Sequence, residues 1–216
     1  MLILFDCDGV LVDSEPLANA VLAEFLTELG LPHTGEECST RYVGRSIPSI
    51  VAEIERESGI KLPADFHAEL WRRDKHAFAG RLPAIPGVAD VIAGLRAQDR
   101  PLCVASSSAP ERIRNSLAVT GLIGHFEPHL YSATQVARGK PAPDLFLFAA
   151  ESMGFDPAEC TVIEDSLAGV QAGVAAGMRV IGFAGGGHCK PDHAAKLLAL
   201  GAEAAFTDMA SLGQVL

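Results

Sequence analysis

The sequence predicts an α/β fold in which a parallel sheet is covered by helices on both faces and a separate helical domain is inserted after the first strand. Two patterns indicate this fold. From residue 87 onward, short apolar runs alternate with segments of helical period, which is typical of a parallel sheet with helices on both sides. Between residues 15 and 80, apolar residues recur at helical spacing without a strand-like run, so this stretch is expected to form a small all-helical domain.

The chain opens with the apolar run Leu2–Phe5, which is typical of a buried parallel strand. Asp6 and Asp8 follow at its carboxyl end, where open α/β sheets place their ligands. Their spacing directs both side chains to one side if the backbone stays extended. Two like charges at the end of a buried strand favour a bound divalent cation or a nucleophile beside an acid. The alternative is a surface pair that opens a turn.

The helical stretch contains three segments with apolar residues at spacings of three and four, which predicts three helices. They cover residues 17–29, 47–54 and 66–78. Gly30 and Gly59 are expected to end the first two helices. Pro83 and Pro86 mark the return to the α/β part of the chain.

Strands and helices are then expected in alternation. The predicted strands cover residues 102–105, 129–131, 161–163 and 179–182. The predicted helices cover residues 88–95, 108–117, 143–153 and 167–175. Ser108 and Glu111 have the spacing of a capping box, so the second of these helices is expected to begin at Ser108.

Polar residues follow the carboxyl ends of two later predicted strands. Ser106 and Ser107 follow one apolar run, and Glu164 and Asp165 follow another. Between them, Lys140 lies in a rigid loop, flanked by a glycine and a proline. This Gly-Lys pair is not a Walker motif, because the upstream glycine and the following Ser or Thr are absent.

Four features follow one another along the chain: the Asp-x-Asp pair, the serine, the lysine and the Glu-Asp pair. In this order they resemble the four motifs of the haloacid dehalogenase-like hydrolase superfamily, which consists mostly of phosphatases and phosphomutases. The resemblance spans essentially the whole chain and is strongest to the helical-cap branch, with β-phosphoglucomutases and 6-phosphogluconate phosphatases among its members. It implies a Rossmann-like sheet with the first strand at its centre and all four motif loops at one edge. It also implies a catalytic core of residues 1–13 and 83–216 and a helical cap domain of residues 14–82, joined by two hinges.

The resemblance also implies catalytic roles. Asp6 would be the nucleophile that attacks phosphorus and forms an aspartyl-phosphate. Asp8 would be the general acid and base that protonates the leaving alcohol and then activates a water. Lys140 would neutralise the phosphoryl oxygens and keep Asp6 charged, although most lysines are simply solvated.

A magnesium site is implied by the same residues. Its ligands would be Asp6, Asp165 and the backbone carbonyl of Asp8, with Glu164 bound directly or through a water. Hard oxygen ligands beside a phosphate substrate favour Mg²⁺. The alternative for the Glu164-Asp165 pair is a cap at the start of the following helix.

Substrate contacts are expected from both parts of the chain. The Ser106 hydroxyl, the Ser107 backbone N–H and Lys140 would bind the phosphate. Arg45, in a loop of the helical stretch, is expected to contact the substrate, and the alternative is a solvated arginine. His188 follows three glycines, and we interpret it as part of a mobile loop rather than as a ligand.

Composition excludes several classes of protein. Lys and Arg number 17 against 27 Asp and Glu, a net charge of −10, so there is no general basic footprint for nucleic acid or an anionic membrane. The five cysteines show no CxxC or Cys/His ligand spacing, which favours reduced, mostly buried thiols. No signal peptide or membrane-spanning run is recognised. We expect a cytoplasmic monomer that binds a small phosphorylated metabolite.

The sequence therefore predicts a Mg²⁺-dependent phosphatase that acts on a sugar or sugar-acid phosphate through an aspartyl-phosphate. One alternative is a hexose-phosphate mutase of the β-phosphoglucomutase type. That type has a His in the first cap helix where ungapped counting places Ala18, which cannot relay a proton. A non-catalytic phosphometabolite-binding module is the alternative from another class, and intact Asp6 and Lys140 argue against it. A dehalogenase is disfavoured because Asp8 and Asp165 are present.

Overall fold

The computed structural model describes residues 1–42 and 47–216. The chain divides into two compact units. One comprises Met1–Asp13 and Pro83–Leu216, and the other comprises Ser14–Leu82.

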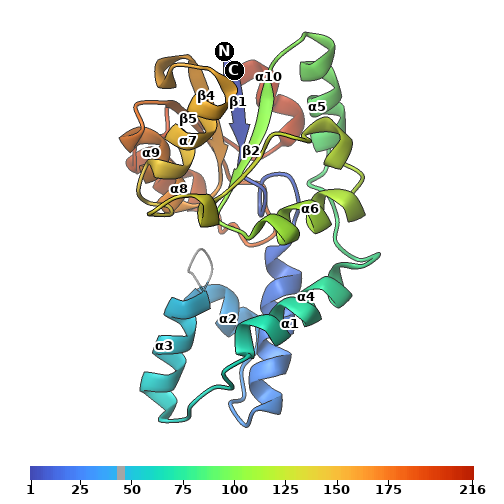
Figure 1. The fold of residues 1–216 in the computed structure, drawn as a ribbon, viewed down its shortest axis with the longest axis vertical. Helices are drawn as coiled ribbons and strands as arrows, with labels where there is room; N and C mark the ends of the chain where they lie inside the picture. The colour runs from blue at the N-terminus through green and yellow to red at the C-terminus, as the bar shows by residue number, and fades with distance from the viewer. Residues whose placement is uncertain (43–46) are drawn as a thin grey trace. The chain divides into compact units, whose positions relative to one another are not determined.

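The first unit is built on six parallel strands in the order β3-β2-β1-β4-β5-β6 (Figure 1). The strands are β1 Leu2–Phe5, β2 Leu102–Ser106, β3 Leu130–Ser132, β4 Cys160–Glu164, β5 Arg179–Phe183 and β6 Ala204–Phe206. The order places β1 in the interior of the sheet, between β2 and β4. The predicted α/β class with a Rossmann-like parallel sheet is confirmed.

Helices follow the strands and pack on both faces of the sheet. They are α5 Val88–Ala97, α6 Pro110–Val119, α7 Asp144–Met153, α8 Leu167–Ala175, α9 His193–Ala199 and α10 Leu212–Val215. Leu2 and Leu4 lie in one apolar cluster with Phe146 of α7. Phe5, which points to the opposite face, meets the ring of Phe126 edge-on at 6.0 Å. Because both faces are covered, β1, β2 and β4 are buried along their whole length.

Helix α6 does not begin where the capping-box spacing predicts. It begins at Pro110 after Ala109, and no side chain caps it. The Ser108 hydroxyl instead donates a hydrogen bond to Asp8 of the first motif loop, 2.7 Å away. The prediction that Ser108 starts the helix was wrong, because a carboxylate from a distant loop competes successfully for its hydroxyl.

Over its described residues, the second unit forms four helices: α1 Glu15–Glu28, α2 Gly35–Tyr42, α3 Ile47–Ser58 and α4 Phe66–Phe78. It has its own apolar core, in which the rings of Phe25 and Phe66 stack at 4.8 Å. Three of these helices follow the predicted segments, whereas α2 was not predicted. Arg45, the expected substrate contact, lies outside the described residues.

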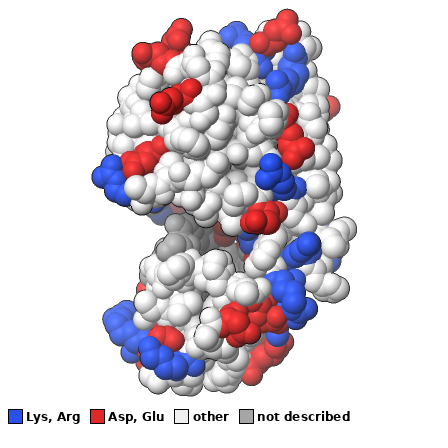
Figure 2. All heavy atoms as spheres, viewed as in Figure 1, with Lys and Arg blue, Asp and Glu red and all other residues white. Residues whose placement is uncertain are grey.

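Charge is mixed on the face drawn in Figure 2, where Lys and Arg side chains are interspersed with Asp and Glu. Among the described helices, none is both long and apolar enough to span a membrane.

Candidate active site

The candidate site is built at the carboxyl ends of three neighbouring strands. In the sheet, Phe5 of β1 pairs with Val104 of β2 on one side and Ile163 of β4 on the other. The backbone N–H of Asp6 continues this ladder by donating to the carbonyl of Ile163, 3.0 Å away. The register therefore brings the residues that follow β1, β2 and β4 to one edge, where parallel sheets place their ligands.

Asp6 and Lys140 form a buried ion pair. Lys140 Nζ lies 2.7 Å from Asp6 Oδ1 and 2.7 Å from Glu164 Oε2, and the Lys140 side chain is only 4% exposed. Burial alone would lower the pKa of Lys140, but the two carboxylates outweigh it and raise that pKa. Lys140 is therefore a fixed positive charge and not a solvated lysine.

One ammonium does not balance the carboxylates around it. Burial raises the pKa of Asp6 well above its usual value, Lys140 opposes this effect, and Glu164 and Asp165 add to it. A nucleophilic carboxylate must be ionised, so the site needs further positive charge.

The carboxylates themselves fit a divalent cation. Oxygens of Asp6, Glu164 and Asp165 lie within 4.8 Å of one another, and all three residues are buried. A set of hard oxygen donors suits Mg²⁺ rather than a softer metal.

Both oxygens of Glu164 are already engaged by the protein. Oε2 accepts from Lys140, and Oε1 accepts from the backbone N–H of Ser166 at 2.9 Å. The turn of α8 that packs on this side chain carries Gly169, where an added Cβ would lie 2.0 Å from the Glu164 carboxyl carbon. Glu164 is thus held in place as the partner of Lys140. The sequence also allowed the Glu164-Asp165 pair to cap the start of α8. Ser166 makes that cap instead, because its hydroxyl accepts from the Gly169 N–H.

Asp165 faces a histidine that the sequence reading set aside. His188 Nε2 lies 3.0 Å from Asp165 Oδ2, and both side chains are 5% exposed. Burial raises the pKa of Asp165, and the hydrogen bond from His188 partly offsets this rise. Gly9 has a φ of +85° and permits the approach, because a Cβ there would lie 1.9 Å from Asp165 Oδ2. The interpretation of His188 as a mobile loop residue was wrong.

His188 also belongs to a second cluster of metal-ligating groups. One ligand atom from each of His188, Cys189 and His193 lies within 4.8 Å of the others. The prediction that no cysteine has a histidine at ligand spacing was therefore wrong for Cys189. The other four cysteines are buried and unpaired, as expected.

Asp8 lies beside groups from α6 and the loop before it. Ser108 Oγ donates to Asp8 Oδ2 at 2.7 Å, and Arg112 Nε lies 3.9 Å from Asp8 Oδ1. Sequence reasoning missed both contacts. Ser106 is buried, and its hydroxyl accepts from the Ser108 N–H at 3.1 Å, whereas Ser107 is exposed. These residues surround the carboxylate assigned as general acid and base.

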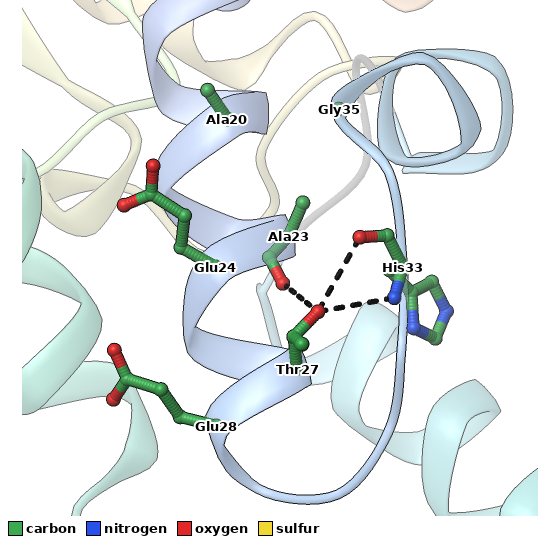
Figure 3. A pocket seen from close by; sticks show the side chains of 7 residues that line it. All are labelled: Ala20, Ala23, Glu24, Thr27, Glu28, His33 and Gly35. Carbon is green, nitrogen blue, oxygen red and sulfur yellow. Dashed lines mark hydrogen bonds between the residues drawn. The ribbon is translucent and has the colours of Figure 1, made fainter.

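A surface pocket in the helical unit is not a candidate for the phosphate site (Figure 3). Its lining is Ala20, Ala23, Glu24, Thr27, Glu28, His33 and Gly35. Thr27 Oγ1 donates to the Ala23 carbonyl at 2.8 Å and accepts from the His33 N–H, so its polar contacts serve to close the end of α1. Two carboxylates in the lining make the pocket unsuited to a phosphate.

The fold and the edge site define an α/β protein with a buried aspartate, lysine and acidic pair. A family model described as haloacid dehalogenase-like hydrolase matches residues 1–177. The chain belongs to this family.

Two relatives are phosphatases of Escherichia coli strain K12. The chain is 30% identical to 6-phosphogluconate phosphatase over 88% of this chain and 85% of that protein. It is 32% identical to hexitol phosphatase A over 82% of this chain and 80% of that protein. The family and these phosphatase relatives make the chain a phosphoric monoester hydrolase.

Two solved structures share the whole fold. A haloacid dehalogenase-like protein from Agrobacterium tumefaciens has a TM-score of 0.85 and 39% identity, covering 99% of this chain and 96% of that one. A family hydrolase from Deinococcus radiodurans, with bound phosphate and sodium, has a TM-score of 0.80 and 38% identity, covering 98% and 92%.

Proposed function

We propose that the protein is a Mg²⁺-dependent phosphatase that hydrolyses a sugar or sugar-acid phosphate through an aspartyl-phosphate on Asp6. The observation that carries this proposal is the buried network in which Lys140 bridges Asp6 and Glu164 beside Asp165. The names of the two phosphatase relatives support the substrate class.

In the first step, an oxygen of Asp6 attacks phosphorus and the ester oxygen leaves. Asp8 gives its proton to that leaving oxygen, so the alcohol departs neutral. Lys140 neutralises charge on the phosphoryl oxygens as it develops, and the Ser106 hydroxyl and Ser107 N–H bind those oxygens.

In the second step, a water attacks the phosphorus of the aspartyl-phosphate and gives a proton to Asp8. Phosphate leaves and Asp6 is regenerated as a carboxylate, so both aspartates return to their starting states. The Ser108 hydroxyl holds Asp8 in position throughout. A cation held by Asp6, Asp165 and the Asp8 carbonyl would supply the further positive charge that the carboxylates require.

The nucleophile is tested with Asp6→Asn. The side chain is nearly isosteric, so we expect the fold to survive and phosphate release to be lost on a panel of phosphorylated metabolites with Mg²⁺. Asp90→Asn, at an exposed position of α5, is the matched control and should keep wild-type activity. Wild-type-like release by Asp6→Asn would exclude Asp6 as the nucleophile.

Hydrolysis is favoured over the mutase reaction by one position in α1. Ala18 stands where a mutase-type histidine is expected, and alanine cannot couple Asp8 to a bound sugar through a hydrogen bond. We therefore expect water to be the normal acceptor of the phosphoryl group. Glucose 1-phosphate, with and without a bisphosphate primer, should yield free phosphate and little glucose 6-phosphate. Efficient isomerisation with little phosphate would overturn the hydrolase assignment.

We also propose that Ser14–Leu82 is the cap that selects the substrate and that Arg45 contacts it. The separate apolar core of this unit supports its role as an independent domain.

A further inference from the structure

The loop after β5 brings three transition-metal ligands together. His188, Cys189 and His193 each offer one atom within 4.8 Å of the other two. Imidazole nitrogen and thiolate sulfur are ligands that Zn²⁺ prefers, whereas Mg²⁺ prefers oxygen. This cluster therefore differs in chemistry from the carboxylates at the strand ends.

The spacing of these atoms fits a tetrahedral site. With bonds of about 2.3 Å to sulfur and about 2.0 Å to nitrogen or oxygen, tetrahedral angles put sulfur and nitrogen about 3.5 Å apart and nitrogen and oxygen about 3.3 Å apart. Cys189 Sγ lies 3.6 Å from His188 Nε2, and Asp165 Oδ2 lies 3.0 Å from the same nitrogen. Two edges of the tetrahedron thus exist before any metal binds.

His193 is oriented as a metal-binding histidine usually is. Its Nε2 lies 2.6 Å from the backbone carbonyl oxygen of Asp165. A carbonyl only accepts, so Nε2 carries the proton and Nδ1 is the ring nitrogen that would ligate a metal. A hydrogen bond from one ring nitrogen to a carbonyl is the common way to fix the tautomer of a ligating histidine.

The His188 ring is held from one side. Its Nδ1 is buried and has no hydrogen-bond partner among the described residues, so the hydrogen bonds that position the ring are those of Nε2. Gly186 allows the ring this close, because a Cβ there would lie 2.9 Å from His188 Cε1.

We propose that His188, Cys189 and His193 form a second metal site, selective for Zn²⁺ over Mg²⁺, with the Asp165 carboxylate as its fourth ligand. The site has a consequence that rests on the proposed function. Because it shares Asp165 with the proposed Mg²⁺ ligands, Zn²⁺ in this site withdraws a carboxylate from the phosphatase centre and inhibits hydrolysis.

Binding is tested without reference to activity. Metal-free protein, reduced with a phosphine, is titrated with Co²⁺, which reports thiolate ligation through an ultraviolet charge-transfer band and tetrahedral geometry through intense visible bands. We expect saturation at one Co²⁺ per chain and displacement by stoichiometric Zn²⁺ but not by millimolar Mg²⁺. Absence of the thiolate band would overturn the proposal.

Variants locate the site. Cys189→Ser should remove the charge-transfer band, and His193→Ala should weaken Co²⁺ binding at least roughly tenfold, by loss of one ligand. Cys38→Ser, at a buried cysteine of the helical unit, is the matched control and should bind like wild type. Circular dichroism and thermal melts establish that each variant is folded. A band retained in Cys189→Ser would place the metal elsewhere and refute the site.

The activity arm separates this proposal from the phosphatase assignment. Wild-type hydrolysis with Mg²⁺ should fall as Zn²⁺ fills the site, and each ligand variant should resist Zn²⁺ relative to its own rate in Mg²⁺ alone. If the protein turns over no substrate of the panel, the Co²⁺ spectra still decide the metal site. If it is active and shows no thiolate band, the metal site alone fails.

Discussion

At the scale of single residues, the site is dominated by buried charge. Asp6, Glu164 and Asp165 are each at most 7% exposed, yet Lys140 is the cation that bridges two of them. Removing one member of such a set leaves a buried charge without its partner, which is far more harmful than losing a surface ion pair. We therefore expect each of these residues to affect both folding and the proposed catalysis.

Ser108 is predicted to position Asp8, the proposed general acid and base. Hydrogen bonds to charged groups contribute about 1.5–3 kcal/mol, so Ser108→Ala should lower kcat roughly tenfold or more and change KM little.

Ser108→Thr is the control, since it keeps the hydroxyl and should recover most of the rate. An unchanged kcat in Ser108→Ala would reduce Ser108 to a structural role.

Neither Ser108 nor His188 was predictable as part of the site. Ser108 is 100 positions from Asp8 in the chain, and its local spacing indicates a helix cap. His188 stands in a glycine-rich stretch that indicates mobility, but Gly9 and Gly186 let it approach Asp165 closely. Their roles depend on contacts between distant segments, which local pattern does not contain.

At the scale of secondary structure, the strongly apolar strands and periodic helices were predictable. The described helices of the helical unit other than α2 follow the predicted segments, whereas α2 buries only Cys38 and Tyr42 and has no apolar repeat to detect. Strand β6 is the three-residue run Ala204–Phe206, which is too short and too rich in alanine to resemble a strand. Such elements form because they pair with a neighbouring strand or pack against a neighbouring helix.

At Gly169 of α8, helix propensity and side-chain packing act in opposite directions on stability. Replacing Gly169 by alanine gains helix propensity of about 0.8–1 kcal/mol, but the Cβ would collide with the Glu164 carboxyl group. Forcing an atom into a packed core commonly costs about 1–3 kcal/mol, so we expect Gly169→Ala to lower Tm by a few degrees and to reduce kcat by displacing the Lys140 partner.

Gly94→Ala is the matched control, because an added Cβ at this position of α5 meets nothing within 4 Å. That variant should be stabilised by about 0.5–1 kcal/mol and keep full activity. A Gly169→Ala protein as stable and as active as Gly94→Ala would show that Glu164 does not need its observed position.

At the scale of the whole molecule, stability is linked to the charge of the site. In the metal-free protein, burial raises the pKa of Asp165 to about 6 from its ordinary value. The folded state then binds more protons than the unfolded state between about pH 4 and pH 6, so this group makes stability fall as pH rises through that window. Above the window, the loss is complete and constant.

This loss of stability is measured relative to the Asp165→Asn variant, whose side chain at this position is neutral at every pH. In EDTA, the stability of wild type relative to this variant should decline from pH 4 to pH 6, as followed by urea unfolding at each pH. The comparison cancels the opposite trend of paired surface acids such as Glu69, whose pKa is lowered by Arg72 and Arg73. Added Mg²⁺ should stabilise wild type most at the upper end of the window, where Asp165 is ionised, and should stabilise Asp165→Asn much less. A difference between the two proteins that does not change with pH in EDTA would mean that Asp165 titrates alike in the folded and unfolded states, and that His188 offsets its burial in full.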